Sequence, residues 1–285
     1  MEKKNNLKKN LPNIILAVFF TIGLCIFLYP SISDFVNEWA QDREVSQYES
    51  KVAEFSYDIY DKMISEAQEY NKSLVGKKLV FNNENNENTN YKDILSVEKT
   101  GILGYLKIPK INVKLPIYHG TDTSILQIGV GHLEGTSFPV PGETVHSVLS
   151  GHTGLPSAKL LTDLVELEVG DTFSIVILNQ IYTYEVDQIL VVEPDETDAL
   201  ELVDGKQYAT VLTCTPYGVN SHRLLVRGFL RENKVNADIS SEAVIIDSSI
   251  IVPIIAIPLI IILFIVMINI RKKKRGKEVD GEKKK

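Results

Sequence analysis

The chain has 285 residues, of which 44% are hydrophobic and 24% are charged. Residues 31–247 carry 17 Lys and Arg against 33 Asp and Glu, a net charge of −16, which argues against nucleic acid as a partner. The only cysteines are Cys25 and Cys214, and Cys25 lies within an apolar run. A disulfide framework is therefore excluded.

Two apolar runs border this acidic region. Residues 14–29 follow four lysines and predict an uncleaved membrane anchor; a cleaved signal peptide is the alternative, because small residues follow Pro30. Residues 250–270 stop at a cluster of Lys and Arg and predict a transmembrane helix. We therefore interpret residues 1–30 as a basic tail with its anchor and residues 271–285 as a second basic tail. Both termini are expected in the cytoplasm, with the region between the runs outside the cell.

The first part of the outer region, residues 31–74, is expected to be helical. Its apolar side chains recur near helical spacing, with few glycines or prolines between them. We expect this helix to pack against its own domain, and a partner-binding helix is the alternative. Residues 75–100 form a loop or lid region, because residues 81–93 are rich in Asn and have no apolar period.

From residue 101 the pattern changes to short apolar or alternating runs broken by Gly and Pro. This spacing predicts an all-β sandwich or barrel over residues 101–232, with one short helix near residues 157–168. Residues 233–249 then form a linker to the second apolar run. The length suffices for one core, and no repeat is evident.

Cys214 is the first candidate catalytic residue. A free cysteine is often a small buried hydrophobe, but Cys214 ends a strand-like run and "TPYG" follows it, so the thiol is expected at an exposed strand end. The next strand carries Arg223, whose guanidinium would lie near the thiol if the two strands pair. An outer cysteine without a partner also suggests a Gram-positive type of cell surface.

A thiol nucleophile needs a partner for proton transfer, and the five histidines supply the choices. His152 lies at a strand end like Cys214, which makes it the leading candidate, and His222 is the alternative. A metal site is not expected, because the Cys and His residues show no ligand spacing. A papain-like site would place its cysteine at a helix start, and no helix is predicted after Cys214. These residues indicate a β-barrel thiol enzyme without a cofactor.

Several motifs resemble those of the sortases. "TVLTC" at residues 210–214 is similar to the signature Thr-Leu-x-Thr-Cys with Val211 in place of leucine, Arg223 falls where the family arginine follows, and "SGHTG" resembles the histidine segment. The resemblance covers roughly residues 100–230 and both flanking apolar runs. Longer segments, among them "GYLKIPKINVKLPIYHGT" and "TCTPYGVNSHRLLVRG", resemble the class C, pilus-assembling sortases.

The resemblance implies a closed sortase-type β-barrel and a role for each residue. Cys214 would attack the Thr–Gly bond of an LPXTG-like sorting signal and form a thioester, His152 would act as general acid and base, and Arg223 would hold the substrate and its oxyanion. Thr213 would contact the substrate. The acceptor would be a lysine of a pilin, and a peptidoglycan amine is the alternative acceptor. The alternative to an enzyme is a membrane-tethered binding module without activity.

One feature departs from the family pattern. Pilus sortases commonly carry a lid with an Asp-Pro-aromatic motif, whereas residues 75–100 contain no proline. Asp93 and Ile94 are the nearest acidic and apolar pair and are the lid candidates. The sequence therefore predicts a lid that is loose or absent.

Overall fold

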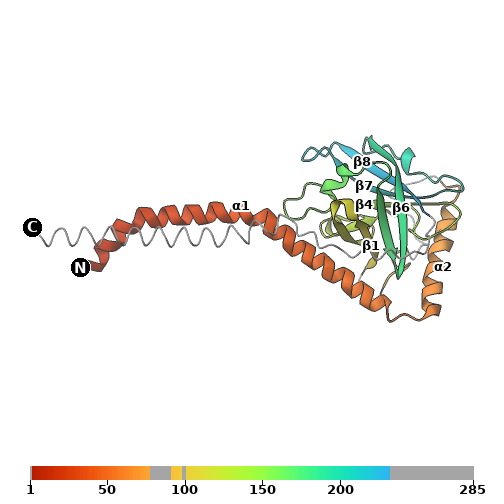
Figure 1. Ribbon diagram of the computed structural model, residues 1–285, viewed down its shortest axis with the longest axis horizontal. Helices are drawn as coiled ribbons and strands as arrows, with labels where there is room; N and C mark the ends of the chain where they lie inside the picture. The colour runs from red at the N-terminus through yellow and green to blue at the C-terminus, as the bar shows by residue number, and fades with distance from the viewer. Residues whose placement is uncertain (1, 78–90, 98–100, 232–285) are drawn as a thin grey trace, which may run out of the picture. The chain divides into compact units, whose positions relative to one another are not determined.

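The computed structural model describes residues 2–77, 91–97 and 101–231 (Figure 1). The chain divides into two compact units at Phe35 and Val36, both within helix α1 (Glu2–Val52). The first unit contains the N-terminal part of α1. Over Val18–Val52 this helix has a window with a mean hydropathy of 1.7, long and apolar enough to cross a membrane by length and composition. The predicted N-terminal anchor coincides with this part of the chain, whereas residues 250–270 lie outside the described residues.

The second unit is built on a closed barrel of eight strands. Their order around the barrel is β1-β2-β3-β4-β7-β8-β6-β5. This confirms the expected all-β closed barrel with short helices. The strands are β1 (Ile102–Ile108), β2 (Val113–His119), β3 (Val130–His132), β4 (Val145–Ser150), β5 (Thr172–Ile177), β6 (Gln180–Val192), β7 (Gln207–Thr215) and β8 (His222–Leu230).

The four short helices between strands contain at most five residues each: η1 (Pro109–Ile111), α3 (Thr123–Leu126), η2 (Thr162–Glu166) and η3 (Asp198–Leu200). The helix expected over residues 157–168 is reduced to η2. Leu160 adopts a positive φ of 43°, which does not fit a right-handed helix, so the helical turn begins only after it.

The helix expected over residues 31–74 is two helices, because the chain turns at residues 53–56 before α2 (Tyr57–Leu74). The turn allows both helices to contact the barrel. Val45, Tyr48 and Val52 of α1 and Ala67 and Tyr70 of α2 are buried in the main core. The helices therefore pack against their own domain, as expected.

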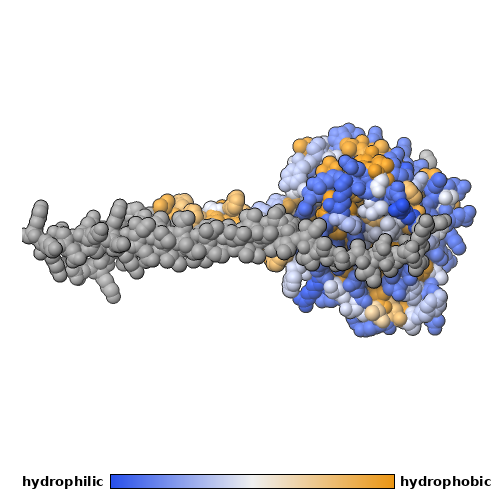
Figure 2. Space-filling view, viewed as in Figure 1, coloured by the Kyte–Doolittle hydropathy of each residue, from blue (hydrophilic) through white to orange (hydrophobic). Residues whose placement is uncertain are grey.

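Not every apolar side chain of α1 is buried. Phe35 and Trp39, two of the apolar positions behind the helix prediction, are 51% and 61% exposed. Figure 2 shows apolar surface along α1 and a mainly hydrophilic surface over the barrel in the same view.

The Tyr48 side chain connects α1 to the barrel through two hydrogen bonds. Its hydroxyl donates to the carbonyl oxygen of Leu103 at 2.9 Å and accepts from the backbone N–H of Leu178 at 2.6 Å. The side chain is fully buried, so these two bonds satisfy polar groups that water cannot reach. The helix and the strands β1 and β5 are thereby held in one arrangement.

Residues 91–97, expected to belong to a loop, form a turn that packs into the core. Tyr91, Leu95 and Val97 are buried. The Tyr91 hydroxyl lies 2.8 Å from Nδ1 of His132, whose Nε2 lies 2.9 Å from the carbonyl oxygen of Ser137. Nε2 carries the proton that is donated to that carbonyl, and burial, which lowers the pKa of the ring, disfavours a second proton, so His132 is neutral.

The buried histidines predict a loss of stability in acid. Burial lowers the pKa of His132 and of His146 to about 4, whereas an unfolded histidine titrates near ~6.5. Between these values the unfolded chain binds more protons, so the free energy of unfolding falls as the pH falls from ~6.5 to ~4. At pH 5 each histidine should cost about 2 kcal/mol relative to pH 7.

Chemical denaturation of the full chain in detergent at pH 7 and pH 5 measures this loss. His132→Gln removes one titrating group and should lose about 2 kcal/mol less than wild type between the two pH values. Equal losses in the two proteins would contradict the assignment of His132.

Candidate active site

Cys214 and Arg223 face each other across two paired strands. The antiparallel register of β7 and β8 makes them direct partners, between the pairs Thr213–Leu224 and Thr215–His222. Side chains alternate along a strand, and Thr213 and Leu224 are buried within the barrel. Cys214 and Arg223 therefore project from its outer face. The Cys214 thiol is free and partly exposed.

His152 follows the neighbouring strand β4. This strand runs parallel to β7, with Ser150 opposite Leu212. Past that pair, the N–H of Gly151 donates to the carbonyl oxygen of Leu212 at 3.0 Å, and the Thr213 hydroxyl donates to the carbonyl oxygen of Gly151 at 2.8 Å. These bonds extend the pairing to the residue before His152. The structure thus brings the three predicted residues to adjoining ends of β4, β7 and β8.

Backbone carbonyls hold the guanidinium of Arg223. Its Nη1 donates to the carbonyl oxygens of Asn220 at 3.2 Å and His222 at 3.0 Å. Among the residues that the structure describes, no ion pair neutralises this group. Its charge and remaining donors are available to a substrate carbonyl beside Cys214.

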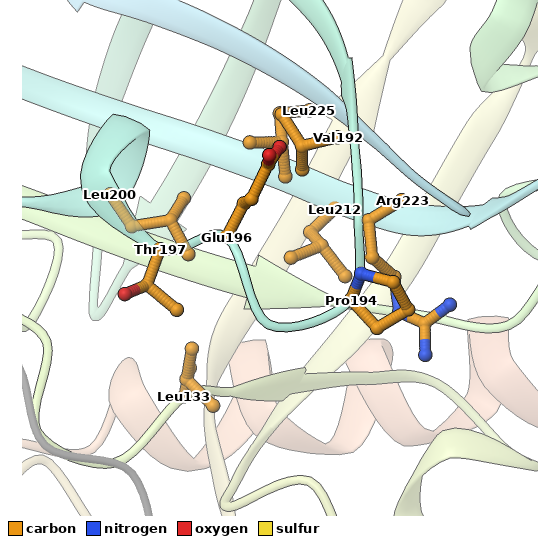
Figure 3. A pocket seen from close by; sticks show the side chains of 9 residues that line it. All are labelled: Leu133, Val192, Pro194, Glu196, Thr197, Leu200, Leu212, Arg223 and Leu225. Carbon is orange, nitrogen blue, oxygen red and sulfur yellow. The ribbon is translucent and has the colours of Figure 1, made fainter. Parts of the chain in front are cut away.

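A pocket of about 160 Å³ opens beside Arg223 (Figure 3). Its wall comes from the β6–β7 loop, residues 193–206, which contributes Pro194, Glu196, Thr197 and Leu200. The strands contribute Val192, Leu212, Arg223 and Leu225, and Leu133 comes from the segment after β3. Leu200, Leu225 and Val148 form a small apolar cluster apart from the main core. The pocket is therefore mainly apolar, with one cationic side chain at its edge.

The alternative base, His222, is engaged elsewhere. Its Nε2 lies 3.2 Å from Oε1 of Glu193, and its Nδ1 lies 2.8 Å from the hydroxyl of Ser221. His119, His132 and His146 are buried and hydrogen-bonded. This geometry favours His152 as the proton-transfer residue, which stays a prediction.

The structure shows other contacts for Thr213 and for Ile94, one of the two lid candidates. Thr213 is buried and its hydroxyl is used on Gly151, so its predicted substrate contact stays a prediction. Asp93 is exposed, and the carbonyl oxygen of Ile94 lies 2.7 Å from Nε2 of His119 at the end of β2. The lid role of this segment also stays a prediction.

The sequence motifs did not reveal the pocket itself. Its walls come from four separate stretches of chain, and no spacing in the sequence shows that they meet. The acidic stretch at residues 193–201 was a weak signal, because such a run usually indicates only a solvated loop.

Comparison with known proteins agrees with this geometry. The model of the Sortase domain family matches residues 106–231. Sortase D of Bacillus subtilis is 36% identical over 114 residues, which cover 40% of this chain and 54% of the relative. Sortase A of Staphylococcus aureus is 22% identical over 222 residues, covering 76% of this chain and 91% of the relative. The chain thus spans about half the length of Sortase D.

The solved structures match over a larger share. Sortase C1 of Streptococcus agalactiae is 47% identical with a TM-score of 0.63, covering 67% of this chain and 99% of that chain. Sortase C of Streptococcus pneumoniae is 38% identical with a TM-score of 0.60, covering 66% of this chain and 96% of that chain. The chain belongs to the sortase family. Its structural neighbours are class C sortases.

The contact between Thr213 and Gly151 can be tested directly. Thr213→Val keeps the volume but leaves the Gly151 carbonyl without its donor, which should lower the free energy of unfolding by about 1–3 kcal/mol. Thr213→Ser keeps the hydroxyl and should lose less. Denaturant unfolding of the full chain in detergent measures both, and an undiminished stability of the valine variant would contradict the contact.

Proposed function

We propose that the protein is a membrane-anchored cysteine transpeptidase of pilus assembly. It cleaves an LPXTG-like sorting signal between Thr and Gly and transfers the acyl group to a lysine amine of a pilin. The pairing of Cys214 with Arg223, beside the strand end that carries His152, is the observation that supports this proposal most strongly. A nucleophile, a proton-transfer group and a fixed cation are the groups that acyl transfer requires.

The first half-reaction forms the acyl-enzyme. The Cys214 sulfur attacks the carbonyl carbon of the threonine, and the negative charge that develops on the oxygen is stabilised by Arg223. The C–N bond to glycine breaks, and His152 gives a proton to the departing amine. The products are a thioester on Cys214 and a free glycine amine.

The second half-reaction transfers the acyl group. The lysine amine attacks the thioester carbonyl, His152 accepts the proton, and the C–S bond breaks to regenerate the thiolate. The new bond is an isopeptide. Water can replace the amine, in which case the reaction ends as slow hydrolysis.

The pocket suits the apolar part of such a signal. Leu200, Leu212 and Leu225 offer an apolar surface to its leucine and proline, and Arg223 lies at the pocket edge, on the strand opposite Cys214. A sorting signal bound in this pocket would place its Thr–Gly peptide bond next to the Cys214 thiol. Apolar pocket walls alone do not distinguish an enzyme from a binding module without activity. Together with the three candidate residues beside them, they favour an enzyme.

The pilus role rests on the class C neighbours. The structure of the Streptococcus pneumoniae protein is described as informative about pilin substrate specificity. Attachment to a peptidoglycan amine would use the same thioester and is the alternative. The apolar N-terminal part of α1 is consistent with membrane anchoring. We place the catalytic domain outside the cell, where substrates retained in the same membrane would meet it at a raised effective concentration.

Formation of the acyl-enzyme tests the reaction. Full-length protein in detergent, mixed with an LPXTG-type peptide, should gain the mass of the acyl fragment on Cys214, because the thioester precedes either acceptor. Cys214→Ala should gain none, and Arg223→Lys should acylate at least about 100-fold more slowly, because a point charge cannot reproduce the planar donors. Absence of any adduct on the wild-type protein would refute the enzymatic reading.

The acceptor is tested separately. Wild-type protein with a pilin that carries both sorting signal and lysine should produce covalent oligomers, and replacing the acceptor lysines by arginine should abolish them. Exclusive coupling of the signal to a peptidoglycan-type glycine amine would instead support the alternative.

A further inference from the structure

Glu193 and His222 are in contact at the start of the β6–β7 loop, which lines the pocket. Nε2 of His222 lies 3.2 Å from Oε1 of Glu193, with the two side chains 41% and 58% exposed. The Ser221 hydroxyl lies 2.8 Å from Nδ1 of the same ring and orients it. Nε2–H donates to Glu193 whether the ring is neutral or protonated, since Nδ1 can accept from the serine hydroxyl or donate to it.

Glu193 stands at the first position of the β6–β7 loop. The last pair between β6 and β8 joins Val192 to Arg223, so Glu193 and His222 are the residues just beyond it. Val192 and Pro194, on either side of Glu193, both line the pocket. The contact between Glu193 and His222 thus links the wall of the pocket to β8, the strand that carries Arg223.

The loop continues into a tight turn. The N–H of Glu196 donates to the carbonyl oxygen of Glu193 at 3.1 Å, and the N–H of Glu193 donates to Oε2 of Glu196 at 3.2 Å. Glu196 lines the pocket. Because of this turn, the position of Glu193 affects the position of Glu196 in the pocket wall.

His222, the second residue of this contact, is also hydrogen-bonded to Arg223. The carbonyl oxygen of His222 accepts from Nη1 of Arg223 at 3.0 Å. A His222 side chain held by Glu193 limits the movement of this carbonyl, and so of the guanidinium. One contact therefore bears on both the pocket wall and the cation.

We propose that Glu193 and His222 are positioning residues that hold the β6–β7 loop against β8 and so shape the site for the sorting signal. The inference rests on the proposed function, since it names residues that serve the same site. Neither residue reacts with the substrate. Their effect is on binding, because an ordered wall lowers the entropy lost when the peptide is seated.

The chain supplies a matched control. Glu185, in the middle of β6, and Arg231, just after β8, form an ion pair at 3.0 Å. Glu185→Ala removes one carboxylate from β6 without touching the pocket, whereas Glu193→Ala removes one just after β6, between two pocket residues. Glu193→Gln removes the charge and keeps an oxygen that can accept from His222.

The experiment measures cleavage of a fluorogenic LPXTG-type peptide by the full-length proteins in detergent. Glu193→Ala should raise KM about three- to five-fold, the size expected for an exposed pair, with kcat changed less than about two-fold. Glu185→Ala should match wild type, and Glu193→Gln should lie nearer to wild type than Glu193→Ala. Equal effects of the two alanine variants, or a glutamine variant as impaired as the alanine variant, would overturn the proposal, because charge alone would then explain the result.

Amide hydrogen exchange provides a readout that does not depend on activity. The amides of residues 195–197 should exchange faster in Glu193→Ala than in wild type, and at the wild-type rate in Glu185→Ala. If wild-type protein cleaved no peptide, the proposed function would fail and exchange alone would decide the positioning role. Unchanged exchange of this segment in Glu193→Ala would overturn that role.

Discussion

The antiparallel register of β7 and β8 is the constraint on which the site depends. It sets Cys214 opposite Arg223 and leaves Thr213 and Leu224 inside the barrel. Because side chains alternate with a period of two, a slip of one residue would turn the thiol into the core and a polar side chain outward. The apolar interior of the barrel therefore enforces the geometry of the groups on its outer face.

The parallel pairing of β4 with β7 adds the third group. It ends at Ser150 and Leu212, and the bonds of Gly151 carry it one residue further, to the position before His152. The loop after β6 then covers the outer face of these strands and forms the pocket. Scaffold and candidate site thus come from different parts of the chain: buried strands set the positions of the three candidate residues, and a polar loop sets the shape of the pocket.

Much of this arrangement could be predicted from the sequence because it depends on local signals. Cys214 precedes a Pro and Gly turn and Arg223 lies in the next apolar run, so both the strand ends and their pairing follow from turn chemistry and alternation. The contact of α1 with the barrel through Tyr48 and the burial of Tyr91 could not be predicted. They depend on contacts with Leu103, Leu178 and His132, which are distant in sequence.

The same reason explains the missed part of the site. The contact of Glu193 with His222 joins two exposed polar residues of a kind that usually face solvent, and nothing local to either one indicates the other. The apolar pattern of α1, by contrast, includes residues that the structure leaves exposed. Phe35 and Trp39 fit a helical pattern, but a pattern does not say whether its apolar face is covered.

A crystal structure of the protein with a sorting-signal mimic joined to Cys214 through a disulfide would test the central claim most directly. We expect the leucine of the mimic to lie among Leu200, Leu212 and Leu225, with the carbonyl next to the sulfur within hydrogen-bond distance of Arg223. A mimic that lay outside this pocket, or a carbonyl directed away from Arg223, would contradict it.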